Sequence, residues 1–105
     1  MYKPESRPGE AAVAKRVIRE CLKQGYTVSV HDGEEWAVKQ SDDFDAIFDA
    51  VGETDSDTLR LRKGANKPTG ELYLIWGNAA DGSELLADHT DNEAMNAIYS
   101  AVYPE

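Results

Sequence analysis

The sequence predicts an α+β domain of the order α-β-β-α-β-β-β-α, with an antiparallel sheet and helices packed mainly on one face. Two observations predict this class. Apolar residues recur at helical spacing in three segments, one near each end of the chain and one in the middle. Between these segments, five short runs alternate apolar with polar residues, which is typical of strands that bury one face. A chain of 105 residues has the length of one domain, so we expect a single domain over residues 10–105.

The first helix follows a short N-terminal arm. Residues 1–9 contain two prolines and a glycine but no periodic apolar residues, so we expect them to be flexible. Gly25 is expected to end the helix, because glycine readily adopts the left-handed conformation found after a helix C-terminus. The apolar stripe that predicts the helix consists of Val13, Val17, Ile18, Cys21 and Leu22.

The next two strands are expected to form a hairpin around His31, Asp32 and Gly33. Side-chain alternation favours a loop of these three residues over a two-residue Asp-Gly loop. The expected pairs are Val30 with Glu34, Val28 with Trp36, and Tyr26 with Val38. This register puts one set of side chains on the buried face: Tyr26, Val28, Val30, Trp36 and Val38.

A second helix is predicted after Ser41, which we expect to be its N-cap. Its apolar face consists of Phe44, Ile47, Phe48 and Val51. At about 100° per residue, four acidic residues fall together on the opposite side. We call this candidate binding surface the acidic stripe, and count the following loop with it: Asp42, Asp45, Asp49, Glu53, Asp55 and Asp57.

The third and fourth strands are predicted in T-L-R-L-R-K and E-L-Y-L-I-W. Their alternation assigns Leu59, Leu61, Leu72, Leu74 and Trp76 to the core. The other face is a second candidate binding surface, because arginine and tyrosine are common in interfaces and an exposed isoleucine suits a partner or a second copy. Its predicted residues are Arg60, Arg62, Tyr73 and Ile75.

The C-terminal part is expected to hold a fifth strand in E-L-L-A-D and a last helix. Thr90 and Glu93 have the spacing of a capping box. The predicted apolar face of that helix is Met95, Ile98 and Val102.

Charge is unevenly distributed along the chain, whose formal net charge is -9. Residues 1–25 carry six basic and three acidic side chains, whereas residues 26–105 carry five basic and seventeen acidic ones. An anionic body repels phosphate backbones, which disfavours direct nucleic-acid binding. The sequence has no apolar run of membrane-spanning length and no signal-peptide pattern, and its one cysteine fits a reducing compartment. We therefore expect no membrane association and a cytoplasmic location.

Enzymatic motifs are not found in the sequence. There is no phosphate-binding loop and no nucleophile elbow, and E-T-D-S-D-T lacks the glycine and glutamate that an EF-hand requires. Asp88, His89 and Asp91 are the alternative, because a histidine beside carboxylates can bind a metal or act as a base. A strand end and a helix start also account for these residues, so we expect neither catalysis nor a cofactor.

The segment from Leu74 to Ala94 resembles a group of small proteins of tailed phages and prophages of proteobacteria. The likeness lies in W-G-N and in a strand that ends in A-D-H-T-D-N at the start of a helix, and the upstream Y-T-V-S-V-H-D-G-E-E-W agrees with it. The resemblance implies a phage or prophage accessory protein made in a bacterial cytoplasm. It implies no activity, ligand or functional residue.

These observations predict a non-enzymatic protein that binds a host or phage protein. Carboxylates on one helix face lie about 5 to 6 Å apart, which permits a DNA-mimic-like inhibitor that contacts its partner through the acidic stripe. One alternative is a structural or chaperone-like protein that forms a homodimer or larger oligomer through the outer sheet face. Another is a metal-dependent enzyme at Asp88, His89 and Asp91.

Overall fold

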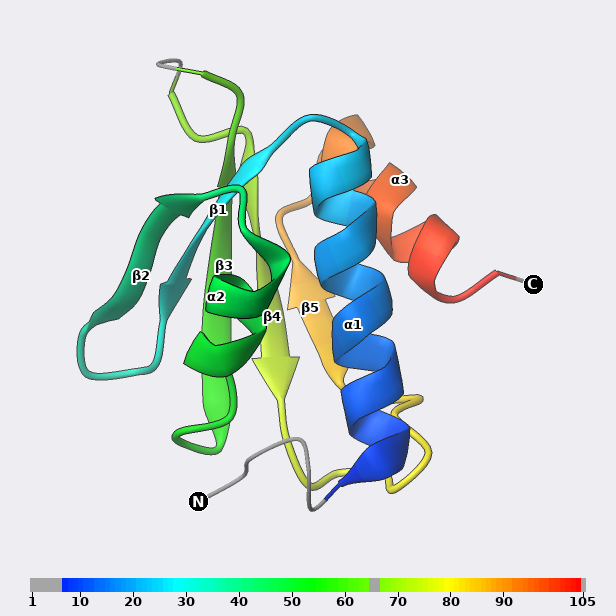
Figure 1. The fold of residues 1–105 in the computed structure, drawn as a ribbon. Coiled ribbons are helices and arrows are strands. Elements are labelled where there is room, and N and C mark those ends of the chain that lie inside the picture. The colour runs from blue at the N-terminus through cyan, green and yellow to red at the C-terminus, as the bar shows by residue number, and fades with distance from the viewer. Residues whose placement is uncertain (1–6, 65–66, 105) are drawn as a thin grey trace.

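The computed structural model describes residues 7–64 and 67–104, and this part of the chain forms one five-stranded antiparallel sheet with three helices (Figure 1). The strand order in the sheet is β2-β1-β3-β4-β5. The predicted class and element order are confirmed. The elements are α1 (Pro8–Lys23), β1 (Thr27–His31), β2 (Trp36–Ser41), α2 (Phe44–Ala50), β3 (Ser56–Arg62), β4 (Gly70–Ile75), β5 (Leu86–His89) and α3 (Glu93–Val102).

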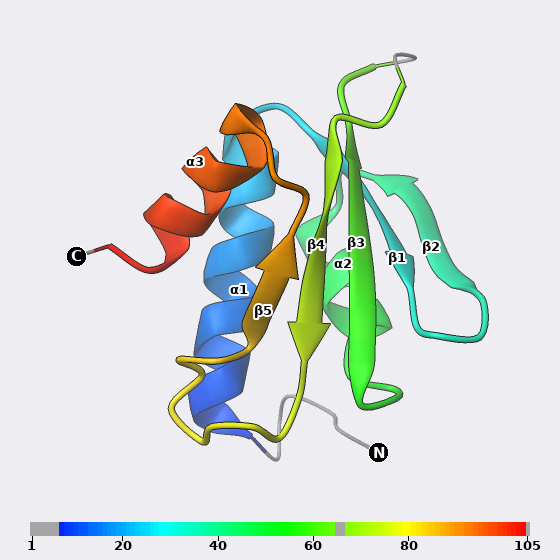
Figure 2. The same cartoon turned by 180° about the vertical axis from the view of Figure 1, so that it is seen from behind.

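The helices lie on one side of the sheet, which we call its inner face. α1 and α2 cross this face, and α3 packs against α1 and against β4 and β5 (Figure 1). From behind, the strands lie in front of α1 and α2, α3 lies beside the sheet next to β5, and no described helix covers the opposite, outer face (Figure 2). None of the described helices is both long and apolar enough to cross a membrane.

Helix α1 begins at Pro8, within the segment predicted to be a flexible arm. Proline suits the first helical turn, where its missing N–H costs no hydrogen bond. Residues 1–6 of the predicted arm lie outside the described residues. The helix ends as predicted: Gly25 has a φ of 90°, its N–H donates to the Leu22 carbonyl, and the Tyr26 N–H donates to the Cys21 carbonyl. These two bonds form a Schellman motif.

The core between helices and sheet contains the residues that strand alternation predicts. Leu59, Leu61, Leu72 and Leu74 are fully buried, and Trp76 is 3% exposed. The close approach of α1 to the loop before β5 depends on Gly82. This residue has a φ of 81°, and a Cβ placed on it would lie 2.5 Å from Val13 Cγ2.

The β1–β2 hairpin has a different register from the predicted one. Its strands pair His31 with Trp36, Val30 with Val38, and Val28 with Ser41, with a register shift between successive pairs. Two irregularities in six residues change the side-chain alternation of β2. Trp36 therefore pairs with His31 on the outer face, and its prediction as a core residue was wrong.

The loop between β1 and β2 is longer than predicted, and this accounts for the first part of the difference in register. The Asp32 N–H donates to the Glu35 carbonyl, and Asp32 Oδ1 accepts hydrogen bonds from the N–H groups of Glu34 and Glu35. These two backbone bonds lower the pKa of the Asp32 carboxyl. Gln40 contributes a second part of the register difference. Its φ of 46° lies in the left-handed region, and its N–H donates to Ser29 Oγ.

Helix α2 is shorter than predicted and has a different cap. Asp43 is the N-cap and accepts a hydrogen bond from the Asp45 N–H, whereas Ser41 ends β2 and accepts from the Asp43 N–H. Ile47 and Val51 are buried as predicted. The rings of Phe44 and Phe48 stack at 5.9 Å and lie under Arg19 and Lys15 of α1.

The cap of α3 also differs from the predicted one. Asn92 Oδ1 accepts a hydrogen bond from the Met95 N–H, so Asn92 and not Thr90 is the N-cap. Thr90 Oγ1 accepts instead from the Glu71 N–H and fixes the helix approach to β4. The predicted apolar face is confirmed, because Met95, Ile98 and Val102 are buried.

Candidate binding face on the outer side of the sheet

The four residues predicted for the outer face of the sheet lie on that face. The β3–β4 register pairs Arg60 with Glu71, Thr58 with Tyr73, and Ser56 with Ile75, while Arg62 pairs with Thr27 of β1. Ile75 is 39% exposed. The outer face comprises the side chains of Ser29, His31, Trp36, Lys39, Thr58, Arg60, Arg62, Glu71, Tyr73 and Ile75.

Arg60 is held at the centre of this face by two neighbours. Its Cζ lies 4.7 Å from the centroid of the Trp36 ring, which is the geometry of a cation–π contact. Its Nε donates to Glu71 Oε2 at 2.8 Å. The side chain of Arg60 nevertheless remains 36% exposed. The guanidinium is therefore fixed in orientation while part of it stays open to solvent.

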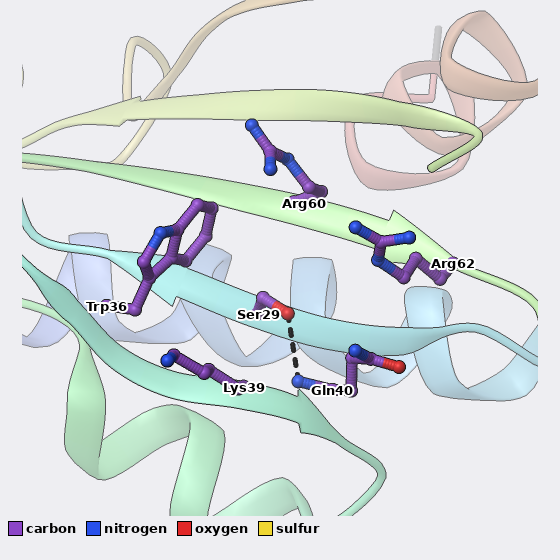
Figure 3. A pocket seen from close by; sticks show the side chains of 6 residues that line it. All are labelled: Ser29, Trp36, Lys39, Gln40, Arg60 and Arg62. Atoms are coloured by element: carbon purple, nitrogen blue, oxygen red, sulfur yellow. Dashed lines mark hydrogen bonds between the residues drawn. The ribbon is translucent and has the colours of Figure 1, made fainter. Parts of the chain in front are cut away.

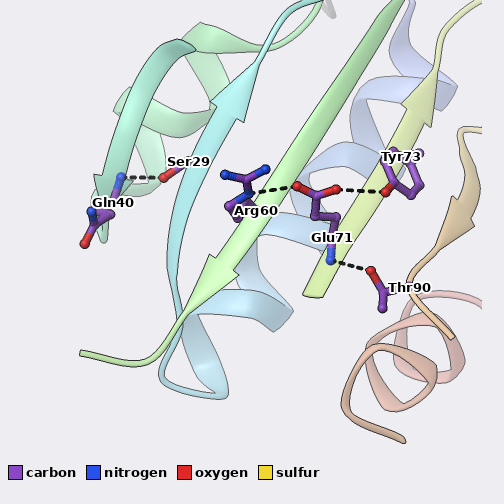
Figure 4. A network of polar contacts seen from close by, with 6 residues as sticks. All are labelled: Ser29, Gln40, Arg60, Glu71, Tyr73 and Thr90. Atoms are coloured by element: carbon purple, nitrogen blue, oxygen red, sulfur yellow. Dashed lines mark hydrogen bonds and ion pairs between the residues drawn. The ribbon is translucent and has the colours of Figure 1, made fainter. Parts of the chain in front are cut away.

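Glu71 is itself fixed by further hydrogen bonds (Figure 4). Its Oε1 accepts from the Tyr73 hydroxyl at 2.8 Å, and its backbone N–H donates to Thr90 Oγ1. Partial burial acts to raise the pKa of the Glu71 carboxyl, but the bonds from Tyr73 and Arg60 outweigh it and lower this pKa. The same bond to Glu71 raises the pKa of the Tyr73 hydroxyl. Glu71 is thus a carboxylate that orients Arg60.

Two shallow hollows meet at the Arg60–Trp36 contact. The first hollow has a volume of about 190 Å³ and lies over β2, β1 and β3 (Figure 3). The second has a volume of about 310 Å³. The first is lined by Ser29, Trp36, Lys39, Gln40, Arg60 and Arg62, and the second by His31, Trp36, Thr58, Arg60 and Glu71.

The first hollow is positively charged although the chain carries a net charge of -9. Lys39, Arg60 and Arg62 line it, and none of its lining residues in the described part of the chain is acidic. Guanidinium groups bind carboxylates and phosphates through paired N–H donors, and a tryptophan beside them adds a flat apolar surface. Chemically, this arrangement is suited to holding an anionic group next to an apolar one.

The structure places the acidic stripe partly on helix α2 and partly in the segments on either side of it. Only Asp45 and Asp49 belong to α2, because the helix begins at Phe44 and ends at Ala50. Asp42 precedes this helix, and Glu53 and Asp55 follow it as exposed loop residues.

Asp57 was wrongly assigned to the acidic stripe. It is 2% exposed, and its Oδ2 accepts hydrogen bonds from Trp76 Nε1 at 2.8 Å and from the Gly52 N–H at 2.9 Å. A carboxylate in this position cannot contact a partner. Its observed contacts connect β3 to the residue after β4 and to the loop that follows α2.

Asp88, His89 and Asp91 are not brought together as a metal centre. Nowhere in the described ranges do three His, Cys, Asp or Glu side chains lie where they could hold one metal ion. Asp88 pairs with Tyr73 on the outer face, whereas the ring of His89 lies 5.1 Å from that of Tyr99 on α3. These neighbouring strand residues point to opposite faces of the sheet.

Sequence reasoning missed the residues that complete the outer face. Trp36 was assigned to the core, and neither Lys39 nor Glu71 was considered as a site residue. Alternation alone places Glu71 on the same face as Tyr73, because Glu71 directly precedes and Tyr73 directly follows the core residue Leu72. Alternation also places Lys39 there, next to Val38, but for Trp36 no such signal exists, because the irregular pairing of β2 breaks the alternation between Trp36 and Val38.

Comparison with known proteins adds no assignment. No protein-family model, curated protein or solved structure matches the chain. The resemblance to small phage and prophage proteins therefore stays a prediction.

Proposed function

We propose that this chain is a non-enzymatic binding domain that contacts a protein partner through the outer face of its sheet. The observation that carries the proposal is the fixed Arg60, which lies over the Trp36 ring and is bonded to Glu71 on a face that no described helix covers. Orienting a side chain before binding reduces the entropy that association costs. Tryptophan, tyrosine and arginine also carry much of the binding energy in protein interfaces.

A protein fits this face better than a small molecule or a nucleic acid does. Sites for small molecules mostly have volumes of about 300 to 1,000 Å³ and enclose their ligand. The first hollow, at about 190 Å³, is below this range and the second, at about 310 Å³, is at its lower end. A net charge of -9 opposes the approach of a polyphosphate chain, whose affinity comes from neutralised phosphates.

The proposal keeps the predicted protein partner but moves the contact away from the acidic stripe. The burial of Asp57 and the short α2, which carries two of the six carboxylates, favour the outer face over the acidic stripe as the contact. The phage resemblance supports a bacterial cytoplasm as the setting, with a host or phage protein as the partner.

Site-specific photocrosslinking tests this proposal. A photoreactive benzoylphenylalanine replaces Lys39, an exposed residue at the first hollow, or Ala12, an exposed residue of α1 that serves as the control. After irradiation in a bacterial lysate, we expect position 39 to give a defined crosslinked protein that position 12 does not give. The same product from both positions, or a product from position 12 alone, would refute an outer-face contact.

A second copy of the chain is the other candidate partner, because Ile75 is exposed on the same face. An exposed isoleucine beside Tyr73 suits a homodimer whose two outer faces meet. Sedimentation velocity at micromolar concentration decides this point. A dimer that dissociates on Ile75→Glu supports self-association through the outer face, and a monomer at all concentrations removes it.

A further inference from the structure

We propose that the partner presents an extended segment bearing a carboxylate, and that the two terminal nitrogens of Arg60 receive it. This inference rests on the proposed function and names the chemistry that the outer face recognises. It assigns separate tasks to the parts of one guanidinium: Nε bonds the chain's own Glu71, the positive charge contacts the Trp36 ring, and Nη1 and Nη2 bind the partner.

The contacts of Arg60 determine which of its donors remain for a partner. Nε is bonded to Glu71 Oε2 at 2.8 Å, and the ring of Trp36 lies 4.7 Å from Cζ. Within residues 7–64 and 67–104, the observed bond of this guanidinium to an acceptor is the one from Nε to Glu71 (Figure 4), and the terminal nitrogens make none. A carboxylate can therefore bind end-on, with one oxygen on each terminal nitrogen.

The surroundings favour an anionic group at this point. Arg62 and Lys39 line the same hollow as Arg60 (Figure 3). Basic side chains of β2 and β3 line this hollow, while the net charge of -9 opposes a polyanion, so the hollow suits one or two carboxylates. A partner's aspartate or glutamate meets this requirement.

The shape of the face indicates an extended segment. The two hollows adjoin, since both are lined by Trp36 and Arg60. Adjacent hollows can accept neighbouring side chains of one extended chain, with the carboxylate at Arg60 between them. The irregular pairing of β2 also makes its edge a poor template for an added strand, so side-chain contacts on the face are the expected mode.

An NMR titration of the full ¹⁵N-labelled chain tests the inference. The probe is the peptide acetyl-Val-Asp-Val-Glu-Val-Asp-amide, and its control replaces every carboxylate by the corresponding amide. We expect the acidic peptide to shift the Trp36 indole and Arg60 Nε signals. The Trp76 indole provides an internal control that should not shift, because it is buried against Asp57. The amide peptide should bind about tenfold or more weakly, which corresponds to the loss of a charge-assisted bond.

Arg60→Lys separates the paired donors from their charge. Lysine keeps one positive charge but cannot bond a carboxylate through two parallel N–H groups, so we expect about a tenfold loss of affinity for the acidic peptide. Arg16→Lys, at an exposed position of α1, is the matched control and should bind as the parent chain does. Unchanged amide spectra away from the outer face will show that both variants fold.

Several results would overturn the inference. These are equal binding of the acidic and amide peptides, unchanged affinity in Arg60→Lys, or no shift with the acidic peptide. Stronger binding of a thymidine octanucleotide or of inorganic phosphate at the same signals would assign the face to phosphate.

Mass spectrometry of the product crosslinked through position 39 distinguishes the carboxylate inference from the proposed binding face. A contact segment without Asp or Glu refutes the carboxylate but leaves the binding face intact, whereas failure of the crosslink refutes the face itself.

Discussion

The guanidinium of Arg60 on β3 lies over the indole ring of Trp36 on β2, with Cζ 4.7 Å from the ring centroid. This contact places Trp36 on the outer face, although side-chain alternation in a regular hairpin assigns it to the core. The chain's two tryptophans therefore have opposite surroundings: Trp36 is partly exposed beside a cation, and Trp76 is buried beside a carboxylate. This difference gives the most direct check on the fold of β2.

The two tryptophans should respond differently to the same truncation. Trp36→Ala removes a cation–π contact at the surface and should cost less than about 1 kcal/mol of unfolding free energy. Trp76→Ala empties a core position and should cost about 3–5 kcal/mol. Urea unfolding followed by circular dichroism measures both. Equal losses, or a larger loss for Trp36→Ala, would mean that Trp36 belongs to the core after all.

Asp57 should prove to be a structural residue and not a binding residue. Asp57→Ala leaves the Trp76 indole and the Gly52 N–H without their shared acceptor, and we expect a loss of about 2–4 kcal/mol of stability. Asp55→Ala, at an exposed loop position two residues earlier, should change stability by less than about 0.5 kcal/mol. Thermal unfolding of the pair checks this, and a neutral Asp57→Ala would contradict the buried assignment.

The bond between Arg60 and Glu71 should give stability a defined pH dependence. Because the folded-state pKa of Glu71 is lowered, its stabilising contribution is fully present above the unfolded-state pKa, about 4.3, and is lost as the pH falls through the folded-state pKa. Glu71→Gln should therefore destabilise the chain at pH 7, by no more than about 1 kcal/mol for so exposed a pair. In urea titrations, the difference in unfolding free energy between Glu71→Gln and the parent chain should shrink towards pH 3. A difference in unfolding free energy that grows as the pH falls would contradict the assigned role of Glu71.

Cys21 should be inert while the chain is folded. Burial, with a smaller contribution from the charge of Glu20, raises the pKa of its thiol to about 12. Little thiolate then exists at pH 8, and the side chain is fully buried. Labelling with a thiol reagent at pH 8 should be slow in buffer and rapid in concentrated urea. Rapid labelling of the folded chain would place Cys21 outside the core.

The sequence predicts the regular part of this structure well, for a physical reason. In β3 and β4, strict alternation assigns Leu59 and Leu72 to the core and Arg60 to the outer face, and the register confirms all three. Gly25 marks the end of α1 because a left-handed position there favours glycine strongly.

Errors occur where short polar side chains compete or where pairing is irregular. Asp43 caps α2 although Ser41 is near, and Asn92 caps α3 although Thr90 is near. Both members of each pair are good caps, so tertiary contacts decide between them. The shifts in β2 depend on hydrogen bonds of Asp32 and Ser29, which periodicity does not reveal. For that reason the position of Trp36 was not predictable, whereas alternation in β3 and β4 places Arg60, Tyr73 and the overlooked Glu71 on the outer face.

Quantitative affinity capture from a bacterial lysate tests the central claim most directly. It compares the natural chain with an outer-face variant, Trp36→Ala with Arg60→Gln, and with an acidic-stripe variant, Asp45→Ser with Asp49→Ser and Glu53→Ser. If the outer face is the contact, the acidic-stripe variant retains the captured partner at the level of the natural chain and the outer-face variant loses it. The reverse pattern, with the partner retained by the outer-face variant and lost by the acidic-stripe variant, would contradict the account.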